Sequence, residues 1–317
     1  MTATGRDAAR GDPGGVGRLP PVLSDPSDPP GAVRVVTDST ACLPAAVDGA
    51  VAPVVVPLRV VAGEETWREG VDITPQEVAA RIAAGERLST SQPAPAEFAA
   101  AYRDLAADGA RAVVGVHLSG ALSGTVEVAA AAGQRAMIPV QAVDSRTVAM
   151  ALGFAALEAA RCAAEGHDAA TVAARARQVA ESSTTVFLVD SLDHLRRGGR
   201  LSAPAAALGT ALGVRPILGM RDGAIEMTQR VRTRRAAIDR LAELAVRRAE
   251  TCERPGVAVH HLGVPERADE LAERLAADTG VEAVVTPVSA VLGAHVGPGA
   301  LAVVVADLGG RPRDVVR

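Results

Sequence analysis

Short runs of β-branched and apolar residues alternate with alanine-rich segments in the first half of the chain, and this alternation constrains the fold more than any other feature. The runs VRVVT (33–37), RAVVGVHL (111–118) and PVQAV (139–143) are separated by segments such as AEFAAAYRDLAADG and TVEVAAAAGQRA, which have helical spacing. Alternation of this kind favours a parallel sheet covered by helices. The pattern therefore predicts an α/β domain.

The pattern changes near Ser182, where TTVFLVD starts a part of the chain with more paired strands. Arg221-Asp222-Gly223 separates two of these strands and is typical of a β-hairpin turn. The first residues are rich in Pro, Gly and Asp and have no apolar core. We expect a disordered tail over 1–31, an N-terminal parallel-sheet α/β domain over 32–182, and a C-terminal α/β domain with a mixed or antiparallel sheet over 183–310.

Composition excludes several classes of function. The chain has no lysine, so a P-loop that hydrolyses nucleotides is excluded, and with 2% aromatic residues it lacks stacking platforms for single-stranded nucleic acid. Its formal net charge of −4 also disfavours nucleic acid as a partner. Three scattered cysteines show no spacing for zinc or disulfides, and no apolar run reaches the ~18 residues of a membrane span. We expect a cytoplasmic protein without metal or cofactor.

Four polar loops lie at strand ends or between helices. They are Asp38-Ser39-Thr40 and the segments at 88–93, 119–124 and 293–299. Ligands of open α/β sheets gather where loops converge outside the carboxyl ends of strands. These loops offer hydroxyl groups, glycines and a single histidine, with almost no carboxylate, which suits an anion that accepts hydrogen bonds.

The loop SGALSGT gives the most specific signal for an anion site. Gly120 and Gly124 come just before a helix, whose first N–H groups and positive dipole end could face a carboxylate or phosphate. The alternative is that Ser123 or Thr125 only caps that helix. The loop with Thr90 and Ser91 is a weaker signal, because a Ser/Thr cluster before a proline is usually turn chemistry.

His295 and the arginine groups each leave two interpretations open. His295 lies among glycines, where it could donate a hydrogen bond to an anion or could simply be structural. The arginines of LRRGGRL and RVRTRR form either a solvated face or a docking surface for an anionic partner or a membrane. The residues singled out for docking are Arg196, Arg197, Arg200 and Arg232.

Taken together, these runs resemble the DegV family, whose pattern is V-x-D-S-T-A-D-L-P, then T-S-Q-P, L-S-G-T and V-D-S. The chain has VTDSTACLP, TSQP, LSGT and VDS in that order. Further matches are GVDITP, LRRGGRLS, RPIL followed by a D-G turn and VRTRR, and the terminal HVGPGAL. The resemblance covers about residues 33–307, nearly everything after the tail.

The resemblance implies a two-domain α/β fold that holds a long-chain fatty acid in a tunnel between the domains. Thr90, with Ser91 beside it, and His295 match the family's carboxyl-binding positions, whereas the family's second serine is replaced here by Gly120. Ser119 or the Gly120 N–H would then substitute for that hydroxyl. Cys42 stands where the family has an aspartate. The supporting loop residues are Asp38, Ser39, Thr40, Leu122, Ser123 and Gly124.

The same resemblance implies a carrier without catalytic activity that presents its acyl group to a separate fatty acid kinase for phospholipid synthesis. Two other functions fit the residues. Ser119 or Ser123 could be the nucleophile of an acyl hydrolase with His295 as base, although GxSxG is absent. The chain could also be a regulatory module that senses lipids.

Overall fold

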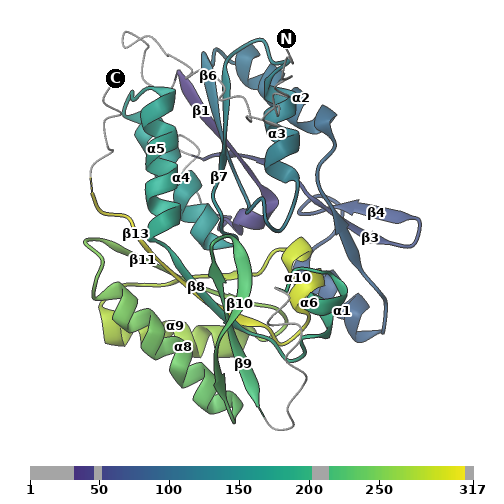
Figure 1. Ribbon diagram of the computed structural model, residues 1–317, viewed down its shortest axis with the longest axis vertical. Coiled ribbons are helices and arrows are strands. Elements are labelled where there is room, and N and C mark those ends of the chain that lie inside the picture. The colour runs from purple at the N-terminus through teal and green to yellow at the C-terminus, as the bar shows by residue number, and fades with distance from the viewer. Residues whose placement is uncertain (1–31, 46–51, 202–213, 311–317) are drawn as a thin grey trace, which may run out of the picture.

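The computed structural model describes residues 32–45, 52–201 and 214–310. Two α/β halves follow one another along the chain (Figure 1). The helix α5 ends at Ser182 and the strand β8 begins at Thr184, so the halves meet where the sequence changes its pattern. The predicted tail at 1–31 lies outside the described residues.

The N-terminal half contains the predicted parallel sheet, with strand order β2-β1-β6-β7. All six residues of β6 are buried, as expected for a central strand covered on both faces. The helices α2 and α3 pack on one face, and α4 and α5 pack on the other (Figure 1). The elements are β1 Val33–Asp38, the 3-10 turn Ser39–Ala41, β2 Val54–Val56, α2 Pro95–Ala107, β6 Ala112–His117, α3 Thr125–Gly133, β7 Val140–Asp144, α4 Met150–Ala164 and α5 Ala169–Ser182.

A small antiparallel sheet, ordered β4-β3-β5, projects from this half. Its third strand corrects the sequence analysis, because part of the predicted polar loop at 88–93 is extended and pairs with β3. The helix α1 starts as predicted, with Pro75 in its first turn and a capping box between Thr74 and Glu77. These elements are β3 Arg59–Ala62, β4 Glu65–Arg68, α1 Pro75–Ala83 and β5 Ser89–Ser91.

The C-terminal half is built on a six-stranded mixed sheet, ordered β10-β9-β8-β13-β11-β12, in which only the β11–β12 pair is parallel. The predicted hairpin is present, with Asp222 and Gly223 between β9 and β10. The helices α8 and α9 cover one face (Figure 1). The elements are β8 Thr184–Leu188, α6 Asp193–Arg197, β9 Arg215–Arg221, β10 Ala224–Val231, α8 Arg234–Ala249, β11 Pro255–His261, α9 Pro265–Thr279, β12 Val284–Pro287, α10 Ala290–Val296 and β13 Leu301–Asp307.

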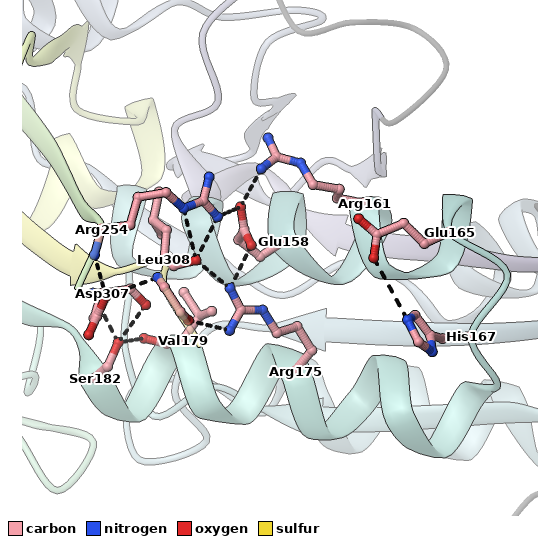
Figure 2. A network of polar contacts seen from close by, with 11 residues as sticks. Glu158, Arg161, Glu165, His167, Arg175, Val179, Ser182, Arg254, Asp307 and Leu308 are labelled. Carbon is pink, nitrogen blue, oxygen red and sulfur yellow. Dashed lines mark hydrogen bonds and ion pairs between the residues drawn. The ribbon is translucent and has the colours of Figure 1, made fainter. Parts of the chain in front are cut away.

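The other face of this sheet packs toward the N-terminal half, and one apolar cluster contains residues from both halves of the molecule. It includes Val114 and Leu152 from the first half and Ala258 and Val304 from the second. Beside the junction of the halves, Glu158 of α4 is hydrogen-bonded to Arg175 of α5 and to Arg254 (Figure 2). The halves therefore share a core and a partly buried ionic network on one side.

Candidate functional site

A cavity of about 340 Å³ lies between the two halves. Its volume falls within the range of ligand pockets, about 300–1,000 Å³. Most of its wall is apolar, and the polar side chains come from the predicted loops and from the C-terminal half. The lining residues are Leu58, Thr90, Ser91, Gln92, Leu118, Leu122, Ser123, Gly124, Val148, Ala149, Thr185, Phe187, Leu195, Arg200, Met220, Ile225, His260, Val288, Val291, Leu292, His295, Val296 and Ala302.

Thr90 and His295 meet at this cavity although they are 205 positions apart in the sequence. The Thr90 Oγ1 and His295 Nε2 atoms are 2.8 Å apart. His295 belongs to the helix α10, which corrects the expectation of a loop at 293–299. Burial, with the nearby charge of Arg200, lowers the pKa of His295 to about 4, so its ring is neutral at pH 7. A neutral ring can donate a hydrogen bond from one of its nitrogens to an anion.

Arg200 supplies the positive charge at this end of the cavity. Its guanidinium group donates to the carbonyl oxygens of Gly198 and Leu122, and no ion pair joins it to a carboxylate among the residues that the structure describes. The sequence predicts a docking role for Arg200, whereas the structure places it in the cavity wall with Thr90 and His295. Together they form a polar end suited to one anionic group.

The SGALSGT loop contributes Ser123 and Gly124 to the cavity. Gly124 precedes the first residue of α3, and no side chain caps this helix, because the Ser123 and Thr125 hydroxyls lie 2.8 Å from each other. A Cβ on Gly124 would lie 2.6 Å from Oε1 of Gln92. The Gln92 amide group therefore lies close against Gly124, and a Cβ there would displace it. Gln92 is a lining residue that sequence analysis did not single out.

Ser119 and Gly120 are not among the residues that line the cavity. The Ser119 hydroxyl donates to the carbonyl oxygen of Gly223, at 2.7 Å, and thus binds the β9–β10 turn. The Gly120 N–H donates to Oδ1 of Asp144, at 3.1 Å. Both groups therefore bond residues that do not line the cavity either.

Asp38, Ser39 and Thr40 lie behind the cavity wall. The buried carboxylate of Asp38 accepts from the Thr40 N–H and hydroxyl through Oδ1, and from the Leu118 N–H through Oδ2. Ser39 accepts from the Leu58 N–H. Leu118 and Leu58 both line the cavity. The Asp38-Ser39-Thr40 loop therefore holds two apolar residues of the cavity wall in place.

His260, to which sequence analysis gave no role, also lines the cavity. Its Nε2 accepts from the N–H of Met150 at the start of α4, and its Nδ1 lies 2.9 Å from Oγ1 of Thr286. Burial lowers the pKa of His260 to about 4, so the neutral ring donates from Nδ1. No sequence signal marks this contact, since it depends on how the halves pack.

The hydroxyls proposed for an acyl hydrolase do not meet a histidine base. Ser119 contacts Gly223 and Ser123 contacts Thr125, whereas His295 contacts Thr90. The arrangement therefore offers no support for the serine–histidine pair of such an enzyme.

The remaining predicted docking arginines lie outside this cavity. Arg232 and Arg197 are exposed, and Arg196 lies 3.9 Å from Asp193. Arg197 and Arg200 also line a second cavity of about 270 Å³ that shares Thr90 and His295 with the first.

Two features are absent from the described part of the chain. No helix in it combines the length and the apolar character that crossing a membrane requires. No cluster of three or more histidine, cysteine, aspartate or glutamate side chains in it could hold a metal ion.

Comparison with known proteins identifies the family. A family model described as "Uncharacterised protein, DegV family" matches residues 32–308. A DegV domain-containing protein of Streptomyces coelicolor is 43% identical over 277 residues, which cover 87% of this chain and 98% of that protein. Among solved structures, DegV of Bacillus subtilis, a fatty acid binding protein, aligns with a TM-score of 0.80 and 35% identity, covering 87% of this chain and 99% of the other. A DegV family protein of Thermus thermophilus, described by its fatty acid binding, aligns with a TM-score of 0.80 and 32% identity over the same shares. The chain therefore belongs to the DegV family.

Proposed function

We propose that this protein binds a long-chain fatty acid in the cavity between its halves. The observation that carries the proposal is the pairing of an apolar wall with one polar end, where Thr90, His295 and Arg200 converge. The fatty acid binding of the Bacillus subtilis and Thermus thermophilus relatives supports it. The carboxylate would lie at the polar end, with Ser91, Ser123 and Gly124 around it, and the chain would follow the apolar wall.

The two parts of the ligand would have different roles. Burying hydrocarbon contributes ~0.8 kcal/mol per methylene, so a sixteen-carbon chain would contribute on the order of 10 kcal/mol before ordering costs. A carboxylate buried without partners would cost several kcal/mol. The Thr90 hydroxyl, the neutral His295 ring and the Arg200 charge would offset that cost. The chain would therefore dominate affinity, and the polar end would fix orientation.

Mass spectrometry of the purified protein under native conditions tests this proposal. The expected result is a retained mass that extraction identifies as a fatty acid, or uptake of palmitate by delipidated protein. Protein that carries no lipid and takes up no fatty acid would refute the proposal.

Replacing Thr90 by valine is expected to weaken fatty acid binding about 10- to 100-fold, because a hydrogen bond to a charged group contributes about 1.5–3 kcal/mol. Valine keeps the shape and removes only the hydroxyl. Titration with a fluorescent fatty acid measures the effect. Thr66→Val, an exposed change on the strand β4 at the far edge of the same sheet, is the matched control and should leave affinity unchanged. Equal affinities of the two variants would place the carboxylate elsewhere.

We further propose that the protein is a cytoplasmic carrier that presents the acyl carboxyl group to a separate fatty acid kinase and catalyses nothing itself. The second cavity supports this proposal, because it also reaches Thr90, Arg200 and His295 and is lined by Arg87 and Arg197. A phosphoryl group could approach the carboxylate there. Arg196, Arg197 and Arg232 are the proposed docking residues, and the same arginines could make transient contact with an anionic membrane.

Reversing the charge of Arg232 tests this docking. Arg232→Glu is expected to lower kinase-dependent formation of acyl phosphate by about tenfold, because a like charge at an interface costs on the order of 1–2 kcal/mol and slows association. Fatty acid affinity should not change, since Arg232 lies outside the cavity. Unchanged acyl phosphate formation at limiting carrier concentration would contradict docking at Arg232.

A further inference from the structure

Glu69 is a buried carboxyl group that joins the two halves of the molecule. It follows β4 and is 6% exposed. Its Oε2 accepts from the Ser39 hydroxyl, at 2.7 Å, and its Oε1 accepts from the N–H of Val291, at 3.2 Å. Among the described residues, no ion pair joins Glu69 to an arginine. The carboxyl group is thus held by hydrogen-bond donors from both halves rather than by a cation.

The hydrogen bonds of Glu69 reach residues that line the cavity from both halves of the molecule, Leu58 and Val291. In the N-terminal half, the Glu69 N–H donates to the Leu58 carbonyl oxygen, and Ser39 accepts from the Leu58 N–H, both at 2.9 Å. Leu58 lines the cavity. In the C-terminal half, Val291 lies in the first turn of α10, which also carries His295. One carboxyl group therefore ties a wall residue to the helix that brings His295 to Thr90.

We propose that Glu69 is a positioning residue that fastens α10 to the N-terminal half, and that ionisation of this carboxyl group favours opening of the cavity and exchange of the fatty acid. The proposal rests on the fatty acid site proposed above. Glu69 itself does not line the cavity, so it would act through Leu58 and α10.

The surroundings of Glu69 give the direction of the pH effect. Burial raises the pKa of Glu69 to about 7, against the opposing effect of the hydrogen bonds from Ser39 and Val291. In an open form the carboxyl group would meet water and regain a lower pKa. The closed form therefore binds the proton more tightly, and raising the pH through 7 favours the open form. Between pH 6 and pH 8 the ratio of open to closed molecules should rise about tenfold.

Other ionisable groups near Glu69 do not account for a change in this range. Burial, followed by the charge of Glu69, raises the pKa of the Cys42 thiol, so it stays protonated, and Asp38 acts on Cys42 in the same direction. His295 and His260 have pKa values of about 4 and remain neutral.

Charged side chains on the elements around α10 have partners of their own. On α1, Glu77 accepts a hydrogen bond from Thr74, and Arg81 donates a hydrogen bond to Glu86. Arg59 of β3 pairs with Glu97. On α6, burial is the main cause that lowers the pKa of His194.

The test compares the wild type with Glu69→Gln, which keeps an acceptor for Val291 and removes the charge. The matched control is Glu65→Gln, an exposed glutamate on β4. Dissociation of a fluorescent fatty acid is followed by stopped flow from pH 6 to pH 8. We expect about a tenfold faster release at pH 8 in the wild type and in the control, and a rate that does not vary with pH in Glu69→Gln. Equal pH profiles in all three proteins would overturn the proposal.

Amide exchange of α10 in delipidated protein tests the same inference without a ligand. The Gly293 and Gly297 amides donate hydrogen bonds to the carbonyl oxygens of Ser289 and Gly293. After correction for intrinsic exchange rates, their protection should fall about tenfold from pH 6 to pH 8 in the wild type but not in Glu69→Gln. Constant protection in the wild type would refute the role of Glu69 even if fatty acid binds. If the protein binds no fatty acid but shows the expected exchange pattern, the proposed ligand is refuted and the role of Glu69 remains supported.

Discussion

Replacing Glu158 by alanine is expected to lower the free energy of unfolding by about 3–5 kcal/mol, because removing one partner leaves a buried charge without compensation. The Glu158 carboxylate accepts from Arg175, at 2.6 Å, and from Arg254, at 2.9 Å (Figure 2). Arg175 is 3% exposed, and it also donates to the carbonyl oxygen of Leu308 beyond β13. The network thus holds the end of β13 on α4 and α5. Urea denaturation measures the loss.

Two further variants show whether burial causes this effect. Arg161 contacts the same carboxylate from a position that is 52% exposed, so Arg161→Ala should cost less than about 1 kcal/mol. The double variant Glu158→Leu with Arg175→Met removes both buried charges and should be more stable than Glu158→Ala, since apolar residues of similar volume replace a buried pair at little cost. A loss from Arg161→Ala as large as that from Glu158→Ala would contradict this account.

The parallel sheet of the N-terminal half could be predicted because its signal is local. Each of its strands is a short apolar run, and a helix or loop of predictable type follows. The order of the C-terminal sheet could not be predicted in the same way, since β13 lies between β8 and β11 and pairs with residues more than 100 positions earlier. The strand Ser89–Ser91 is polar and short, so only its pairing with β3 makes it extended.

For the candidate site, too, local motifs could be read from the sequence, whereas contacts between distant parts of the chain could not. Thr90 and His295, which the motifs single out, lie at one cavity, but the direction of a side chain depends on packing. Arg200 points into the cavity wall, and Ser119 points to the β9–β10 turn. His295 lies in a helix because Ser289 caps α10 and because Gly293 lets the helix approach Leu262, where a Cβ would be 3.2 Å away. Gly293, one of the glycines that suggested a loop, therefore serves close helix packing, whereas Gly297 and Gly299 follow the helix with positive φ.

Filling the cavity by Ala302→Phe is expected to weaken palmitate binding by about 100-fold. Ala302 lies on β13 between His260 and Phe187 of the neighbouring strands, and it lines the cavity. A phenylalanine ring there would occupy space that the acyl chain needs. Excluding about four methylenes at ~0.8 kcal/mol each would cost about 3 kcal/mol, or roughly 100-fold in affinity.

The dependence of affinity on chain length gives the sharper readout of this variant. In the wild type, each added methylene should tighten binding about fourfold until the cavity is full. In Ala302→Phe, that gain should stop at a shorter chain, whereas octanoate should bind both proteins alike because Thr90, His295 and Arg200 are unchanged. Ala302→Val is the intermediate control, and thermal unfolding shows that the variants are folded. If palmitate binds Ala302→Phe as tightly as the wild type, the acyl chain does not occupy this cavity.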